Sequence, residues 1–255
     1  QQWLPLGPDE AKGTSVGQGY NQRIALDGNG YPMVVDRDYG LGGVFRVRRW
    51  DGTAWHLLGG NGFFAAGASL SDLVLDAAGD PVLASNDPAM GDRLTVRRWN
   101  GTLWETVGPS GFSTGGVSFV NLARDAAGNL VVAYVDNANT GQVTVQRWNG
   151  SSWEVLGVDG ISNTNAYFLK LAIGPDGEPV VAYLDIPNSH GFMAQRWNGS
   201  AWEVLNATGL PSAIVSMDLA VASNGDPLLA IEDADDGNRM TVRQWNGTEW
   251  EAVGP

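Results

Sequence analysis

The chain has 255 residues, of which 43% are hydrophobic, with a formal net charge of −13 and no Cys. That apolar content is enough for a sizeable core, while disulfides, thiolate metal sites and cysteine nucleophiles are excluded. So acidic a surface repels phosphate backbones and anionic lipids, and no apolar run reaches the roughly 18 residues of a membrane helix. Neither a nucleic-acid partner nor membrane insertion is therefore expected.

The first seven residues resemble half of a hairpin that recurs later in the chain. Residues 1–7 end in Trp-Leu-Pro-Leu-Gly, which matches Trp-Glu-Val-Leu-Gly at residues 153–157. We expect an extra N-terminal strand here, able to add to a sheet edge or to pair with a second copy in a homo-oligomer. The first residue is Gln, as in a mature secreted chain without its signal peptide or a chain cut from a longer one. We expect a secreted or cell-surface protein.

One ten-residue stretch is written five times. Its clearest copy, residues 96–105, reads Val-Arg-Arg-Trp-Asn-Gly-Thr-Leu-Trp-Glu, and its first Trp recurs every 48 or 49 residues. The Trp pairs are Trp50 and Trp55, Trp99 and Trp104, Trp148 and Trp153, Trp197 and Trp202, and Trp245 and Trp250. So regular a period indicates one repeated supersecondary unit. Asn-Gly between two alternating runs predicts a hairpin with a two-residue type I′ turn, in which Trp99 faces Thr102 and Arg97 faces Trp104.

The rest of each repeat predicts two more strands. In the third repeat, residues 120–124 form a strand, residues 125–129 a short turn ending near Gly, and residues 130–134 a returning strand. A longer loop rich in Gly, Asn and Asp then leads into the Trp hairpin. Since no segment shows a helical apolar period, each repeat should consist of four antiparallel strands.

Five repeats of four strands, each 40–50 residues long, are the signature of a β-propeller. These units resemble the Trp-rich propeller repeats of bacterial secreted proteins, with a kelch-like or tachylectin-like organisation. The resemblance covers nearly the whole chain and implies an all-β fold: a single five-bladed β-propeller domain of four-stranded antiparallel blades, with the extra N-terminal strand. The expected blades are approximately residues 8–59, 60–108, 109–157, 158–206 and 207–255, preceded by the strand in residues 1–7.

The loops between second and third strands differ in sequence from blade to blade, as at residues 39–43, 88–91, 186–190 and 235–238. Variable loops on a rigid frame are where folds acquire sites, so we assign ligand binding to that face. The candidate residues are a repeated Asp that follows each second strand and a set of aromatics that differ between blades. They are Asp38, Asp87, Asp136, Asp185 and Asp233, with Tyr39, Phe63, Phe112, Tyr167 and Phe192.

Two interpretations of the repeated Asp stay open. The carboxylates could form a ring that recruits a cation or accepts hydrogen bonds from ligand hydroxyls, or each could close its own loop through an Asx-type bond to the backbone. No cofactor is expected, although calcium is possible at Asp233, Asp235 and Asp236, a fragment of a calcium loop.

Catalytic motifs are scarce, because two His and no Cys leave little material for a zinc centre, a Cys–His pair or a Ser–His–Asp triad. We expect no catalytic residues and a binding module for carbohydrate. The many Trp could form a sugar-stacking platform or could pack one blade on the next. The alternatives are a protein-interaction scaffold or adhesion protein with a protein ligand, and a glycosidase or polysaccharide lyase that uses two carboxylates.

Overall fold

A computed structural model describes residues 19–254 apart from residues 61, 65–66, 69–70, 186–190, 206–207 and 212–213. The strand and the oligomer contact expected in residues 1–7 lie outside the described residues, as does the loop at 186–190. In the described part, no helix is both long enough and apolar enough to span a bilayer.

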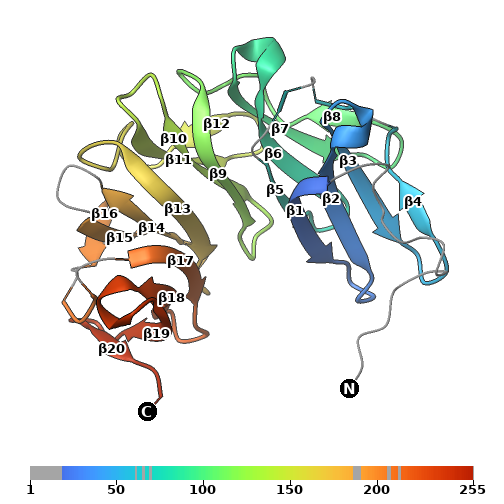
Figure 1. The fold of residues 1–255 in the computed structure, drawn as a ribbon. Coiled ribbons are helices and arrows are strands. Elements are labelled where there is room, and N and C mark those ends of the chain that lie inside the picture. The colour runs from blue at the N-terminus through green and yellow to red at the C-terminus, as the bar shows by residue number, and fades with distance from the viewer. Residues whose placement is uncertain are drawn as a thin grey trace. The chain divides into compact units, whose positions relative to one another are not determined.

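The chain contains five four-stranded antiparallel sheets, each with its strands in chain order (Figure 1). Each sheet corresponds to one predicted repeat, and with its loops we call it a blade. Blade 1 consists of β1 (Gly19–Leu26), β2 (Pro32–Asp38), β3 (Val44–Trp50) and β4 (Trp55–Leu57). Blade 2 consists of β5 (Ser71–Leu75), β6 (Pro81–Asp87), β7 (Arg93–Trp99) and β8 (Trp104–Thr106).

Blade 3 consists of β9 (Val117–Arg124), β10 (Leu130–Asp136), β11 (Gln142–Trp148) and β12 (Trp153–Val155). Blade 4 consists of β13 (Ala166–Ile173), β14 (Pro179–Asp185), β15 (Gly191–Trp197) and β16 (Trp202–Leu205). Blade 5 consists of β17 (Ile214–Val221), β18 (Pro227–Asp233), β19 (Arg239–Trp245) and β20 (Trp250–Ala252). Blades 1 and 2 lie in one compact unit, Gln1–Phe112, and blades 3 to 5 in another, Ser113–Pro255. The single-domain organisation stays a prediction.

The second strands form the core of the blades. Every residue of β10 and β14 is buried, as expected for strands that are covered on both faces. Within the second unit, the first strand of blade 4, β13, contacts the first strands of both neighbours, β9 and β17. Within the first unit, β1 contacts β5 in the same way. Successive blades of a unit therefore pack first strand to first strand.

The Trp hairpin differs from the predicted two-residue turn. Trp99 pairs directly with Trp104 and Arg98 with Glu105, so residues 100–103 form a four-residue loop. The reason is the Asn100 side chain, whose Oδ1 accepts from the backbone N–H groups of Thr102 and Leu103 at 3.0 and 2.9 Å. An Asx-type turn of this kind needs a positive φ only at Gly101 (94°), not at both central residues of a type I′ turn.

The hairpin of blade 1 forms the same four-residue loop, but the donor and the acceptor of its side-chain hydrogen bond are exchanged. In blades 2 to 5 the Asn side chain donates to a Glu, as Asn246 does to Glu251 at 2.7 Å. In blade 1 Asp51 replaces the Asn and His56 replaces the Glu, with 2.6 Å between Asp51 Oδ2 and His56 Nε2. Hydrogen bonds from Ala54, Thr53 and His56 hold the pKa of the Asp51 carboxyl well below its usual range. The two exchanges compensate each other, and the loop survives.

The second Trp of the hairpin ties neighbouring blades together within each unit. Trp104 in blade 2 donates its indole N–H to the backbone carbonyl of Leu58 in blade 1 at 3.1 Å. Trp202 in blade 4 makes the same bond to Leu156 in blade 3 at 2.7 Å. The next residue of the preceding blade, Gly59 or Gly157, lies against the two indoles with a positive φ. We call this bond with its glycine the indole staple. It supports the expectation that the Trp pack blade on blade.

The staple predicts which glycine cannot be replaced. A Cβ on Gly59 (φ 73°) would lie 2.5 Å from Trp104 Cδ1, whereas a Cβ on the adjacent Gly60 (φ 76°) would meet nothing within 4 Å. Both alanines suffer the same strain at positive φ, about 1 kcal/mol, but only Gly59→Ala also overpacks, by roughly 1–3 kcal/mol more. Chemical denaturation should therefore show Gly59→Ala clearly less stable than Gly60→Ala. Equal losses would contradict the packing assigned to Gly59.

Candidate functional site

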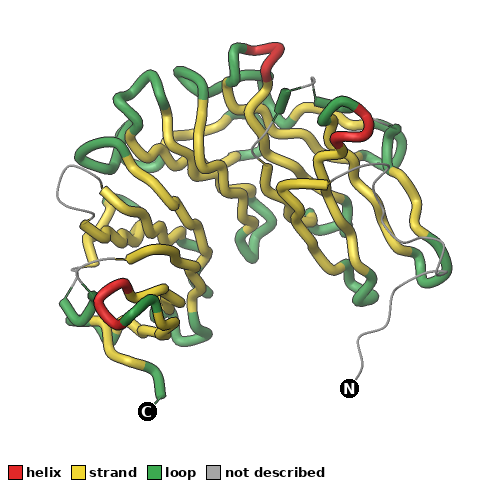
Figure 2. Tube along the Cα trace, viewed as in Figure 1, coloured by secondary structure: helices red, strands yellow, loops and turns green. Residues whose placement is uncertain are grey.

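Four of the five repeated Asp residues close their own loops, whereas the loop that follows the fifth, Asp185, lies outside the described residues. All five are buried, with exposures between 0 and 7%. Four of them accept a hydrogen bond from the backbone N–H two residues later, at 2.9 to 3.1 Å. These four are Asp38, Asp87, Asp136 and Asp233. In blades 1, 2 and 5 the Asp also caps a short 3-10 helix, drawn in red in Figure 2: η2 (Tyr39–Leu41), η3 (Pro88–Met90) and η5 (Ala234–Asp236).

The loops that vary in sequence therefore share one backbone conformation. In four blades the Asp carbonyl accepts from the N–H five residues on, as from Gly43 to Asp38 and from Asn238 to Asp233. The carboxylates have further partners within their own blades: Arg46 reaches Asp38 at 2.5 Å, and Thr114 and Gly115 donate to Asp136. Buried oxygens engaged in this way have little capacity left for a ligand. These bonds match the loop-closing interpretation, whereas a ligand role for the Asp stays a prediction.

Two of the three Asp residues at the possible calcium site, Asp233 and Asp236, have partners in their own loop. Asp233 Oδ1 accepts from the backbone N–H groups of Asp235 and Asp236, and Asp236 lies 3.5 Å from Arg239. Within residues 19–254, leaving out the gaps given above, no three acidic or His side chains are grouped as a metal ion requires. The side chains of Asp233 and Asp236 therefore bind the loop backbone and an arginine, and calcium binding here stays a prediction.

The predicted aromatics divide into exposed and packed residues. Tyr39 is 50% exposed with the guanidinium of Arg37 4.8 Å from its ring centre, and Phe112 and Tyr167 are partly exposed. Phe192 is 6% exposed and packs edge-on against Trp250, so its assignment to a ligand surface is corrected to the core. Phe63 also packs internally, on Trp104.

Sequence reasoning missed two aromatics next to Tyr167. Phe119 in β9 and Phe168 in β13 both have a positive φ, 49° and 53°, at bulges where the strand register shifts. The Phe119 ring lies edge-on to Tyr167 at 5.7 Å and 6.2 Å from Phe168, which is 44% exposed. A bulky residue at positive φ carries strain, often found at functional positions. No spacing in the sequence reveals such a bulge.

A pocket of about 460 Å³ lies where blade 3 meets the Trp hairpin of blade 4. Its volume falls within the range of roughly 300–1,000 Å³ typical of small-molecule sites. The connection after β12 forms one side and the hairpin the other. The lining residues are Gly157, Val158, Gly160 and Ile161, with Gln195, Trp197, Ser200, Ala201 and Trp202.

This pocket, the blade 3–4 pocket, combines an aromatic wall with neutral polar groups. The Trp197 and Trp202 rings are 5.5 Å apart at 58°, and the staple to Leu156 holds the second indole in place. Gln195 Nε2 donates to the Ile161 carbonyl at 3.1 Å and to the Tyr183 hydroxyl at 2.5 Å. No charged side chain lines the pocket. It therefore suits a neutral ligand with one apolar face.

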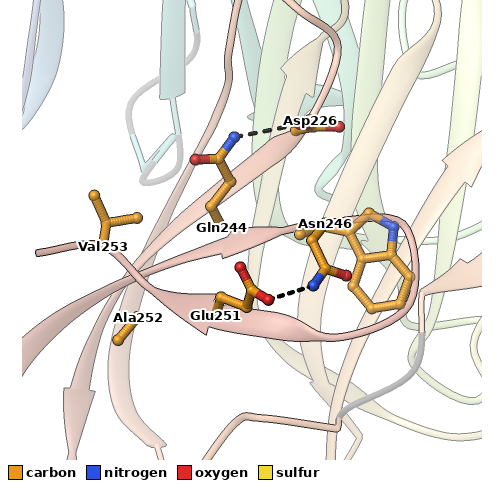
Figure 3. A pocket seen from close by; sticks show the side chains of 7 residues that line it. Asp226, Gln244, Asn246, Glu251, Ala252 and Val253 are labelled. Carbon is orange, nitrogen blue, oxygen red and sulfur yellow. Dashed lines mark hydrogen bonds between the residues drawn. The ribbon is translucent and has the colours of Figure 1, made fainter.

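A smaller pocket of about 280 Å³ lies along the hairpin of blade 5 (Figure 3). It brings together two carboxylates, Asp226 and Glu251, each bound to an amide: Gln244 at 3.3 Å and Asn246 at 2.7 Å. Two carboxylates are the minimum for glycoside hydrolysis. The Asn246–Glu251 bond recurs in the hairpins of blades 2 to 4, so this carboxylate serves the turn.

The fold is similar to those of several solved structures. The α-L-arabinanase of Penicillium chrysogenum complexed with arabinobiose is 14% identical, with a TM-score of 0.59 over 93% of this chain and 81% of that one. The Aleuria aurantia lectin in complex with α-methyl-L-fucoside is 14% identical, with a TM-score of 0.60 over 91% and 76%. A polysaccharide lyase of family PL25, an ulvan lyase, is 12% identical, with a TM-score of 0.61 over 91% and 68%.

At sequence identities of 12 to 14%, structural similarity shows the fold alone. The chain is a five-bladed β-propeller. This confirms the predicted fold class, while the kelch-like or tachylectin-like type stays a prediction. No family model matches the sequence, and no curated protein is significantly similar to it.

One substitution separates the two roles considered for the repeated Asp. Asp136→Ala removes the acceptor of three backbone N–H groups, those of Thr114, Gly115 and Ala138. We expect a loss of about 3 kcal/mol in unfolding free energy and unchanged glycan binding. The matched control is Asp176→Ala, which removes an exposed Asp from a turn and should cost under about 1 kcal/mol. Lost glycan binding with unchanged stability would instead assign Asp136 to the ligand.

Proposed function

We propose that the protein is a non-catalytic carbohydrate-binding module of lectin type and that the blade 3–4 pocket holds the sugar. The observation that carries this proposal is the indole wall of Trp197 and Trp202 beside neutral hydrogen-bonding groups. Sugars present an apolar face of C–H groups and an edge of hydroxyls, so they need an aromatic plane together with amide or hydroxyl partners.

The staple makes the Trp202 ring suitable for stacking. Its N–H is already bonded to Leu156, so the ring is fixed in orientation and offers a ligand its face. Polar groups sit around it, namely the Gln195 amide and the Ser200 hydroxyl, which donates to Asn198 Oδ1 at 3.0 Å and keeps its lone pairs. A ligand pays little ordering entropy at such a preorganised surface.

A single shallow site of this kind binds weakly, and presentation to a repetitive polymer can raise avidity by about 10²–10⁴-fold. This favours a polysaccharide or a dense glycan surface as the ligand, which agrees with the expected secreted or cell-surface location. The similar lectin is in complex with a fucoside, whereas the similar arabinanase and ulvan lyase are enzymes. A carboxylate glycosidase or lyase and a protein-interaction scaffold are therefore the alternatives to be distinguished.

The test is retention of the protein on insoluble cellulose, chitin, xylan and arabinan, together with a soluble glycan array. Ala201→Glu introduces at the pocket the residue that stands at the equivalent position of the blade 5 hairpin, Glu249. Because that hairpin tolerates Glu there, the variant hairpin should fold normally. We expect at least about tenfold weaker retention from this bulk and charge. Ser152→Glu makes the same change in the hairpin of blade 3, outside the blade 3–4 pocket, and should leave retention unchanged.

Product analysis of the same samples distinguishes binding from cleavage. The proposal expects retained protein and neither new reducing ends nor unsaturated products. Cleavage of a retained polymer would favour the glycosidase or lyase. Absence of retention on every glycan, or equal losses in both variants, would overturn the proposal and leave the scaffold alternative.

A further inference from the structure

In the first unit, the position that corresponds to the blade 3–4 pocket is filled by a side chain of the protein itself. Phe63 follows the staple glycine Gly59 by four residues, as Ile161 follows Gly157, although the backbone bond that Ile161 donates to Val143 is donated in the first unit by Gly62, to Phe45. Trp104 likewise corresponds to Trp202. The Phe63 ring lies on the Trp104 indole with 4.2 Å between ring centres and 14° between planes, a close parallel stack.

The filled position is closed to solvent. Trp104 is 8% exposed, and its indole N–H bonds to Leu58 as the Trp202 indole does to Leu156. The staple is thus the same in both places, and the ring on top of the indole is the difference. Phe63 shows that the fixed indole accepts a flat apolar ring at stacking distance.

The blade 3–4 pocket lacks that ring. Ile161 supplies a shorter side chain, its carbonyl binds Gln195, and Trp202 remains partly exposed above a space of about 460 Å³. In blade 5 the corresponding Trp250 is 1% exposed and its backbone N–H donates to Thr208, so that position is closed as well. Each of these three junctions is contained in one unit, and within the residues that the structure describes only the junction of blades 3 and 4 leaves its indole partly exposed.

We infer that the blade 3–4 pocket takes a neutral sugar ring stacked on Trp202 in the place that Phe63 occupies on Trp104, and that Phe63 blocks an otherwise competent second site. The inference rests on the proposed function and adds to it the ligand class and the residue that determines occupancy. Neutral sugars fit because no charged side chain lines the pocket, whereas a uronate would bring an unpaired carboxylate to a chain with a net charge of −13.

Two reciprocal substitutions test this inference, and each introduces the residue that the chain has at the other site. Ile161→Phe should fill the blade 3–4 pocket, and Phe63→Ile should open the equivalent one on Trp104. The readout is the indole N–H region of a ¹⁵N spectrum, with the Trp202 and Trp104 signals assigned from Trp→Phe variants. The probes are methyl glycosides of neutral hexoses, deoxyhexoses and pentoses, with glucuronate as the charged comparison.

In the wild type we expect a neutral glycoside to shift the Trp202 signal but not that of Trp104, and glucuronate to bind at least about tenfold more weakly. Ile161→Phe should abolish the Trp202 shift. Phe63→Ile should add a Trp104 shift with a dissociation constant within about threefold of that for Trp202. Thermal melting of both variants checks that they are folded, and should Phe63→Ile unfold, Phe63→Leu replaces it.

The outcomes separate this inference from the proposed function. A wild type that shifts no indole signal with any glycoside overturns both. Binding at Trp202 that survives Ile161→Phe, or a folded Phe63 variant without a Trp104 shift, overturns the inference alone and leaves the protein a lectin. Tighter binding of glucuronate than of every neutral glycoside overturns the assigned ligand class.

Discussion

The structure depends on the indole staple, a hydrogen bond from the second Trp of one blade to a backbone carbonyl of the blade before it. At the junctions of Trp104 and Trp202 the bond fixes three sequence features together. The Trp must lie at the start of the fourth strand, the carbonyl must directly follow the fourth strand of the preceding blade, and the next residue must be Gly. These requirements account for the Trp and the Gly at these two junctions, whereas the position equivalent to Gly157 before blade 5 holds Asn206.

The staple also determines where a site can form. It holds the indole by its edge and leaves the ring face to whatever the connection between blades places over it. In one junction that is the ring of Phe63; in another it is a pocket bordered by Ile161 and Gln195. On the proposed function, a single residue in the connection therefore decides whether the face of the indole is open to a ligand. The loops that begin with Asp are less suited to this, because their backbone closure is the same in four blades.

The sequence predicted the blades because the period, the alternation of apolar residues and the Gly-terminated turns all act within one repeat. It did not predict the hairpin register, because a side-chain acceptor on Asn100 stabilises a four-residue loop where Asn-Gly favours a two-residue one. The internal packing of two predicted site aromatics was missed for a related reason. Whether Phe63 covers Trp104, or Phe192 enters the core, depends on packing between neighbouring repeats, which a pattern within one repeat does not record.

A crystal structure of the protein soaked with the tightest-binding neutral glycoside gives the most direct test of sugar recognition by a stapled indole. We expect a sugar ring stacked on the face of Trp202, with hydroxyls bonded to the Gln195 amide or the Ser200 hydroxyl and the bond from Trp202 to Leu156 intact. A sugar bound instead beside Tyr39 or along the loops that begin with the repeated Asp, with the pocket at Trp202 empty, would contradict it.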